Sequence, residues 1–419
     1  MSRINNFVSR DWASAGLGTL TRAVPLVLVL AVLIMAGPMS QAQDFTVIHN
    51  FSGPDGAYPW STPTMDGHGN LYGTTNGGGA AGLGMVYQLA HVNRSWVMHP
   101  LYSFTGGSDG YDIFDGVTIG PDGTLFGVAR GGGDAGGWGT LYNLKPPAHA
   151  CAAAPCPWTE TTLHAFAGGD NDGGFPSGIV FDSQGNLYGN TEVGGLYGQG
   201  TVYEATRSGG TWNFSVIYDF GASAADGGTP GAGPVLDSAG NLYGTTLLGG
   251  AYGYGTVFEL SPSKGGWIET ILHSFTGSDG DYPGPLGLVF DRAGTLYGAT
   301  VGEYRRLPGT IFELSPKDGG WTFTTIYTFP ISGAGSLATD ATGNLYGANP
   351  DGGNGWGNVF EFSQGEYTDL YDFTPYGYDG SVSVGGVVVT GPGGYLYGTT
   401  LSGGAYYDGV IYQINLGAH

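Results

Sequence analysis

Cysteine and positive charge are scarce in this sequence. Only 2 of its 419 residues are Cys, and 12 Lys and Arg stand against 34 Asp and Glu, which gives a formal net charge of -22 at pH 7. Two thiolates supply only half of a tetrahedral metal site. A strongly acidic surface repels phosphate groups, so we exclude nucleic acid as a partner.

Helical patterns and short catalytic motifs are also missing after residue 42. Apolar residues there do not recur at the spacing of a helix face, which excludes helical and α/β folds. The chain contains neither Gly-x-Ser-x-Gly nor His-Glu-x-x-His. Its many Asp residues still allow paired carboxylates for glycoside hydrolysis, so an enzyme is neither indicated nor excluded.

The first 42 residues have the features of a secretory signal peptide. Three arginines precede the apolar run 23–37, and the small-residue pattern Ser40-Gln41-Ala42 follows it. The run is shorter than the roughly 20 residues that span a bilayer as a helix. We therefore expect cleavage before Gln43, no membrane span afterwards, and a secreted monomer, extracellular or periplasmic, formed by residues 43–419. An uncleaved anchor is the alternative.

Both cysteines lie in one insertion, residues 145–158. Cys151 and Cys156 are close enough in sequence to close a small loop, and an oxidising compartment favours a disulfide between them. Metal binding is the weaker alternative, because His149 alone does not complete a site.

One repeated stretch organises the rest of the chain. The form GNLYGTTLLGGAYGYGTVFEL at Gly240–Leu260 recurs seven times, at intervals of about 49 to 62 residues. Glycine, 83 residues in all, separates short apolar runs, and 13% aromatic residues argue against disorder. The copies align on the Gly after the aromatic residue: Gly73, Gly127, Gly189, Gly244, Gly298, Gly347 and Gly398.

Each repeat contains four strand-like runs: one ending in Phe, a small apolar run, Leu-Tyr-Gly-x-Thr, and Gly-Thr-Val-Phe-Glu-Leu. Seven such units predict an all-β fold, a seven-bladed β-propeller with four antiparallel strands per blade. The run Thr46–Phe51 has no blade of its own, and the last repeat, which ends at Ile414, lacks its Phe-ending run. We expect these two ends to join and close the ring. A linear β-solenoid is the competing architecture.

The repeat resembles the GloVer (Gloeo/Verruco) tandem repeat, whose core is Gly-Asn-Leu-Tyr-Gly-Thr-Thr, Gly-Gly and Gly-Thr-Val-Phe-Glu-Leu. Strict copies stand at Gly69–Thr75, Gly185–Gly189, Gly240–Thr246 and Gly343–Gly347. The resemblance implies an exported repeat protein with no established activity. Members of this family often carry a sorting or anchoring tail, and no such tail is evident here.

Two kinds of loop should share one face of a propeller: the loops that join blades and the Gly-rich loops after Leu-Tyr-Gly-x-Thr. The blade-joining loops carry six Asp residues that could together bind Ca²⁺, which prefers several oxygen ligands. The alternative is ordinary turn chemistry, in which each Asp bonds its own backbone. These residues are Asp55, Asp109, Asp172, Asp226, Asp279 and Asp379.

The Gly-rich loops carry aromatic residues suited to the apolar faces of sugars, although such rings could equally brace neighbouring loops. These residues are Trp138, Tyr197, Tyr252, Tyr254, Trp356, Tyr406 and Tyr407. One repeat departs from the pattern at residues 301–308, where Arg305 and Arg306 could bind a carboxylate or merely offset the acidic charge. His49, His164 and His273 alternate with Tyr in the Phe-ending runs and are interpreted as packing residues.

These observations favour a binding or interaction module for carbohydrate or another cell-surface polymer. The alternatives are a polysaccharide lyase or glycoside hydrolase on the same scaffold, and a purely structural envelope protein. A binding module predicts aromatic residues grouped on one face, and an enzyme predicts an axial cleft with two carboxylates in different environments.

Overall fold

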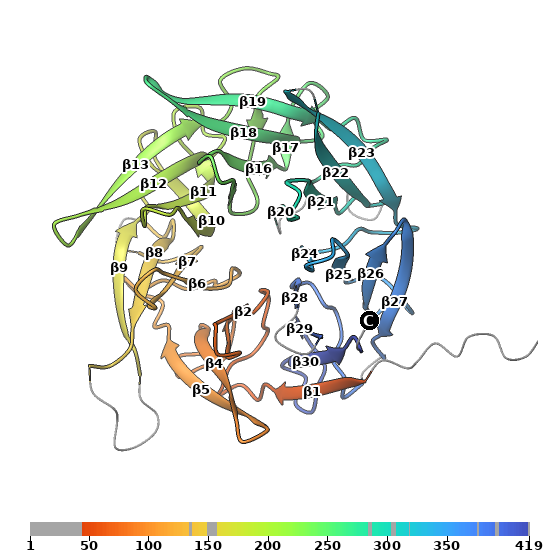
Figure 1. Ribbon diagram of the computed structural model, residues 1–419. Helices are drawn as coiled ribbons and strands as arrows, with labels where there is room; N and C mark the ends of the chain where they lie inside the picture. Colours follow the sequence, from red (N-terminus) through yellow and green to blue (C-terminus); the bar gives the residue numbers. More distant parts are fainter. Residues whose placement is uncertain are drawn as a thin grey trace, which may run out of the picture. The chain divides into compact units, whose positions relative to one another are not determined.

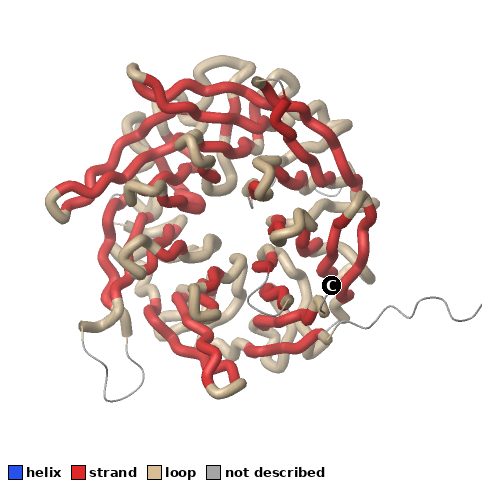
Figure 2. Tube along the Cα trace, in the orientation of Figure 1, coloured by secondary structure: helices blue, strands red, loops and turns tan. Residues whose placement is uncertain are grey.

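Seven small antiparallel sheets form a ring around a central axis (Figure 1). The computed structural model describes residues 44–133, 136–148, 157–283, 287–302, 307–317, 319–374, 377–389 and 394–417. Figure 2 shows only strands and loops in these ranges, which therefore contain no helix able to span a bilayer. The predicted seven-bladed β-propeller is confirmed.

Every blade has four strands, and the first strand of each blade lies closest to the central axis. The innermost strands are β2 (Thr64–Met65), β6 (Thr118–Ile119), β10 (Gly173–Phe181), β15 (Val235–Leu236), β20 (Val289–Phe290), β24 (Leu337–Thr339) and β28 (Val387–Val389). The second strands are β3 (Leu71–Thr75), β7 (Leu125–Ala129), β11 (Leu187–Gly194), β16 (Leu242–Thr246), β21 (Leu296–Thr300), β25 (Leu345–Asn349) and β29 (Tyr395–Thr400).

The outer half of each blade is a longer hairpin. The third strands are β4 (Met85–Val92), β8 (Thr140–Lys145), β12 (Thr201–Ser208), β18 (Thr256–Ser263), β22 (Thr310–Lys317), β26 (Asn358–Ser363) and β30 (Val410–Asn415). The outermost strands are β5 (Ser95–Ser103), β9 (Thr159–Ala165), β13 (Thr211–Asp219), β19 (Gly266–Ser274), β23 (Gly320–Thr328), β27 (Glu366–Asp372) and β1 (Phe45–Asn50). A further short pair is β14 (Gly227–Gly228) and β17 (Leu248–Gly249).

The ring closes as the sequence predicts. β1 pairs antiparallel with β30, with Phe45 opposite Ile414 and Asn50 opposite Val410, and so supplies the outermost strand of the last blade. The closure pairs the exposed edge that each end of an open array would leave.

The outermost strands extend further than their sequence pattern predicts. The run ending in Phe220 predicts a strand from Ile217, whereas β13 already begins at Thr211. Its first half alternates between exposed and half-buried residues, because only every second side chain contacts the preceding blade. Trp212 meets Phe126 in this way, and Trp267 of β19 meets Tyr188, with ring centroids 5.7 and 5.8 Å apart.

In each blade, a glycine of the second strand lies directly against an aromatic ring of the third strand. Gly244 pairs with Phe258, and a Cβ on Gly244 would stand 2.5 Å from the Phe258 ring. The corresponding distance is 2.3 to 2.5 Å in every blade. The other pairs are Gly73 with Tyr87, Gly127 with Tyr142, Gly189 with Tyr203, Gly298 with Phe312, Gly347 with Phe360, and Gly398 with Tyr412. The Leu-Tyr-Gly of the repeat thus keeps room for the ring that fills each blade.

We expect Gly244→Ala to lower the free energy of unfolding by about 1 to 3 kcal/mol, because the added methyl group displaces the buried Phe258 ring. Urea denaturation measures the change. Gly265→Ala in the same blade is the control, since a Cβ there meets no atom within 4 Å. Equal losses in both variants would contradict this packing role.

Candidate functional site

The two predicted loop types do lie on one face. In several blades the blade-joining loop pairs with the loop between the second and third strands of the blade that it enters: Ala57 bridges Gly77, Tyr111 bridges Gly131, and β14 pairs with β17. We call this surface the loop face. The turns within the inner and the outer hairpins lie on the opposite face, because successive hairpins alternate.

One residue in most blade-joining loops has a left-handed backbone. The N–H of Thr229 donates to the carbonyl of Gln199 in the preceding blade, and its own carbonyl accepts from Leu247 in the blade that it enters. A β-branched residue in this conformation is strained by roughly 1 to 3 kcal/mol, so the link between blades must hold it there. The residues at this position, with φ between 50° and 62°, are Tyr58, Asp112, Phe175, Thr229, Tyr282 and Val382.

The six candidate Ca²⁺ ligands each bind their own loop. Asp226 accepts hydrogen bonds from the N–H groups of Gly221, Ala222 and Gly227 at 2.7 to 2.9 Å. Asp279 accepts the N–H and the hydroxyl of Thr276 at 2.8 Å each. In the described ranges no three His, Cys, Asp or Glu residues are grouped so that they could hold a metal ion. The structure therefore does not bring these Asp residues together around a cation.

The His and Tyr residues of the Phe-ending strands pack and also hold these loops. His273 stacks on Phe323 with ring centroids 3.6 Å apart, and its Nε2 lies 3.0 Å from Asp279. Burial lowers the pKa of His273, although the adjacent Asp279 opposes the shift. His164 makes the corresponding contacts with Phe214 and Asp172. Their interpretation as packing residues is confirmed.

The aromatic residues predicted to bind sugar divide into two groups. Trp138 and Trp356 are half-buried, and Trp138 lies against Gly168 of the adjacent blade-joining loop, so it braces that loop. Tyr254 is 39% exposed and covers Gly277 in the same manner. The residues displayed most fully are Tyr197, Tyr252, Tyr406 and Tyr407, at 48 to 65% exposure.

Other predicted residues lie outside the described ranges. This applies to Arg305 and Arg306, to the expected disulfide between Cys151 and Cys156, and to the leader, residues 1–42.

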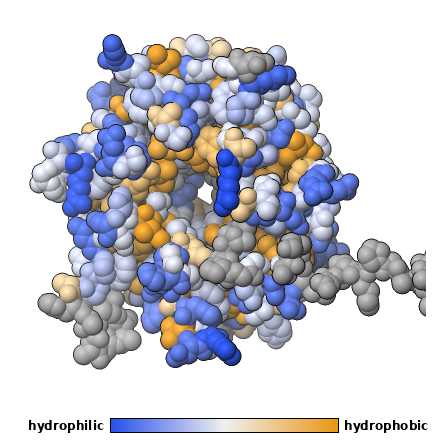
Figure 3. Space-filling model, viewed as in Figure 1, coloured by the Kyte–Doolittle hydropathy of each residue, from blue (hydrophilic) through white to orange (hydrophobic). Residues whose placement is uncertain are grey.

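An axial cavity opens at the loop-face ends of the innermost strands. It measures about 230 Å³, and residues from six blades line it, among them Ser61, Asp115, Gly178, Gly233 and Ser336. A space-filling view along the axis of the ring shows a hollow at its centre (Figure 3).

One loop-face position differs among the blades. The residue three positions after the Gly of each second strand lies close to the end of that strand, and this residue is polar or charged in blades one to three: Asn76, Arg130 and Glu192. The same position is apolar in blades four to seven: Leu247, Val301, Pro350 and Leu401. This position is therefore polar in three successive blades and apolar in the other four.

Six half-buried residues form what we call the mouth cluster: Trp60, Phe114, Asp115, Arg130, Phe175 and Glu192. The guanidinium of Arg130 lies 5.6 Å from the ring centroid of Phe114 and 5.5 Å from that of Phe175. Its Nη2 donates to Glu192 Oε2 at 2.5 Å. Trp60 meets Phe114 edge to face, with centroids 5.1 Å apart. Flat apolar surfaces thus adjoin fixed hydrogen-bonding groups.

Two carboxylates of the mouth cluster have raised pKa values. Burial raises the pKa of Asp115 to about 6, although the N–H of Gly178 and the charge of Arg130 oppose the shift. Asp115 is half-buried as a residue and lines the axial cavity. Burial also raises the pKa of Glu192, and the ion pair with Arg130 partly offsets that rise. Both groups therefore resist ionisation more than exposed carboxylates do.

Sequence reasoning missed the mouth cluster. The signal was present in the change from apolar to charged residues after Leu-Tyr-Gly-x-Thr, and in Asp115, which stands just before an innermost strand. Only the ring shows that Arg130 and Glu192, 62 residues apart, are neighbours.

Seven blades with a loop-face mouth define a β-propeller built from tandem repeats. The sequence matches the Gloeobacter/Verrucomicrobia repeat over residues 39–154 and 153–338, and the chain belongs to this family. The resemblance of its repeats to this family is thus confirmed. No curated protein matches the sequence.

Several solved structures share the fold. The extracellular domain assigned to a hybrid two-component system of B. thetaiotaomicron is 13% identical, with a TM-score of 0.54 over 88% of this chain and 39% of that one. A polysaccharide lyase, an ulvan lyase bound to GlcA(1-4)Rha3S, is 10% identical, with a TM-score of 0.51 over 89% and 96%. A Lactobacillus plantarum protein is 16% identical, with a TM-score of 0.51 over 78% and 91%. At these identities the likeness shows the fold alone.

We expect Asp115→Asn to stabilise the protein at pH 7 by up to about 3 kcal/mol, since it removes a carboxylate that the fold holds near pKa 6 rather than near 4. The folded state binds the proton more tightly than the unfolded state, so this carboxylate makes stability fall as pH rises from about 4 to about 6. Urea denaturation across this range should show that the difference in free energy of unfolding between the variant and the native protein grows with pH and then becomes constant. A constant difference at every pH would contradict the assignment.

Proposed function

We propose that this protein is an exported binding module and that its loop face binds a saccharide at the mouth cluster. The observation that carries the proposal is the geometry of the mouth cluster, where Trp60 and Phe114 adjoin the Arg130–Glu192 pair. The rings offer apolar surface to the faces of a pyranose, and the charged pair offers a donor and an acceptor to its hydroxyl groups.

The distribution of exposed apolar residues supports the choice of face. All the exposed large hydrophobic residues in the described ranges lie in loop-face loops, except Val92, Val97 and Ile268. Loops on a rigid scaffold are where binding usually resides. The exposed tyrosines Tyr252 and Tyr406 would then contact the parts of a longer glycan that lie beyond the mouth.

A second function, polysaccharide cleavage, has one observation in its favour. Asp115, with a pKa of about 6, shares the mouth with Glu192, whose environment differs. General acid–base catalysis favours groups that titrate near the working pH. Incubation with uronate-containing and neutral polysaccharides, followed by measurement of unsaturated products and reducing ends, distinguishes a lyase, a hydrolase and a binding module. Products that form with the native protein and not with Asp115→Asn would make it an enzyme.

Calorimetry against a panel of neutral, carboxylated and sulfated oligosaccharides tests the binding proposal. We expect Trp60→Ala to weaken binding of the recognised class by about tenfold or more, because stacking aromatic residues anchor such sites. Ile268→Ser, on an outermost strand away from the loop face, is the control and should bind normally.

The remaining outcomes are equally informative. Loss of binding in Tyr252→Ala with Tyr406→Ala, together with normal binding in Trp60→Ala, would place the site on the outer loops rather than at the mouth. No binding of any saccharide and no product would favour the purely structural role.

A further inference from the structure

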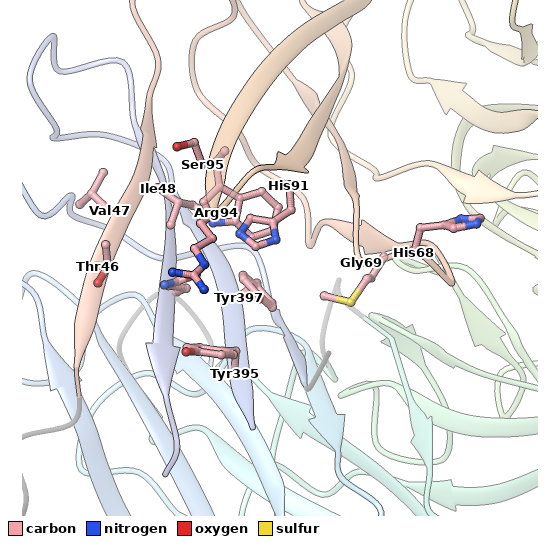
Figure 4. A pocket seen from close by; sticks show the side chains of 13 residues that line it. Thr46, Val47, Ile48, His68, Gly69, His91, Arg94, Ser95, Tyr395 and Tyr397 are labelled. Atoms are coloured by element: carbon pink, nitrogen blue, oxygen red, sulfur yellow. The ribbon is translucent and has the colours of Figure 1, made fainter. Parts of the chain in front are cut away.

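A second cavity, of about 580 Å³, lies on the opposite face where the ring closes. The last blade contributes Tyr395, Tyr397 and Gln413, and the first blade contributes His91, Arg94 and Trp96. We call it the closure groove. In Figure 4 the side chain of Arg94 extends from its hairpin toward Tyr395 and Tyr397, whereas His68 points away.

The same kind of groove recurs between blades five and six, which allows a direct comparison. That groove measures about 370 Å³ and contains Tyr297, Glu313 and the turn Gln364-Gly365. Strand pairing sets Glu313 opposite Tyr297 and, in the last blade, Gln413 opposite Tyr397. The closure groove therefore has a neutral amide where its counterpart has a carboxylate.

A further carboxylate is missing from the last blade. In the blades that precede it, an Asp in the turn between the first two strands binds an Asn or Thr at the next strand, as Asp237 accepts from Asn241 at 2.8 Å. The hydroxyl of the tyrosine in the second strand can also donate to this Asp, as that of Tyr243 does to Asp237 at 3.1 Å. In the last repeat of the sequence Tyr395 stands where the others have Asn or Thr, and the four residues before it, Gly391-Pro392-Gly393-Gly394, include no Asp.

The closure groove also contains a positively charged side chain, that of Arg94. Arg94 is the second residue of the turn between β4 and β5 and has a φ of 67°. The corresponding residues Gly210, Gly319 and Gly365 have φ values of 80° to 87°. An Arg in this left-handed conformation is less favourable than Gly by roughly 1 to 2 kcal/mol. Arg94 adopts a strained conformation at a position where other repeats have Gly. This indicates that its charge has a role.

The carboxylate of Asp66, in the inner hairpin turn of the first blade, forms no ion pair with Arg94. Asp66 accepts hydrogen bonds within its own turn, from the N–H of His68 and from the N–H and side chain of Asn70, at 2.8 to 2.9 Å. Within the described ranges no ion pair involves Arg94. In a protein of net charge -22, the closure groove is thus a local site of positive charge beside aromatic rings.

We propose that the closure groove binds the end of an acidic saccharide, a pyranose that carries a carboxylate or a sulfate. Arg94 binds the anionic group, because its planar guanidinium matches both oxyanions through paired hydrogen bonds. Tyr395 and Trp96 supply ring surface, and Gln413 supplies a donor and an acceptor for hydroxyl groups. The cavity volume is in the range of small-molecule sites. This site is separate from the mouth cluster and does not depend on it.

Calorimetric titration with methyl glucuronide, galactose 6-sulfate and methyl glucoside tests the proposal. We expect the anionic sugars to bind, more weakly as salt is added, and the neutral sugar to bind at least about tenfold more weakly. Binding of only one anionic sugar identifies the oxyanion. Equal binding of the neutral sugar, or no binding of any of the three, overturns the proposal.

Arg94→Gly is the decisive variant because it restores the residue of the other turns and should not impair folding. It should weaken binding of the anionic sugars by about tenfold or more and leave the melting temperature equal or higher. Lys264→Gly, which removes a positive charge from the equivalent turn of blade four, is the matched control and should bind normally.

Trp60→Ala separates this site from the mouth cluster. Its binding of the anionic sugars should match that of the native protein even if the loop-face site is lost. Normal binding by Arg94→Gly, with loss of binding by Trp60→Ala, would assign the anionic ligand to the mouth and overturn the proposal for the closure groove.

Discussion

Each blade depends on one contact, the aromatic ring of the third strand lying across a glycine of the second. A side chain at that glycine would occupy the volume of the ring, so the two positions are fixed together, as Gly244 and Phe258 are. The ring fills the blade and leaves its tip buried. In four blades the ring is a Tyr, and the hydroxyl groups of Tyr87, Tyr142 and Tyr203 have no hydrogen-bond partner in the described structure. The corresponding hydroxyl of Tyr412 lies 3.3 Å from that of Ser383.

The connection between blades depends on a second repeated device. The left-handed residue of the blade-joining loop bonds the preceding blade with its N–H and its own blade with its carbonyl, as Thr229 does. The Asp of the same loop accepts hydrogen bonds from N–H groups of that loop, as Asp226 and Asp279 do. Oxygen atoms already committed to their own turns are poorly placed to gather around a cation. A frame held in this way can change its exposed residues without losing its shape.

Departures from the repeat mark both candidate sites. At the mouth, Arg130 and Glu192 occupy a position that is apolar in four blades, and the pair meets beside the half-buried Asp115. At the closure groove, Arg94 replaces a glycine and Tyr395 replaces an amide or hydroxyl residue. The most conspicuous departure in the sequence, residues 301–308, has its central residues 303–306 outside the described structure. Repetition thus makes the rare substitutions informative.

The sequence by itself determined the fold class, the number of blades, the ring closure and the common face of the two loop types. These features follow from local patterns of strands, turns and glycines that repeat at a fixed period, so each copy reinforces the others. It could not determine which loop residues meet. Trp138 braces a loop whereas Tyr252 is exposed, and Trp60, Arg130 and Glu192 form one cluster, because these relations depend on the curvature of the ring and on how each loop lies over the next blade. Proximity between loops of neighbouring blades is a property of the folded ring and cannot be read from the linear chain.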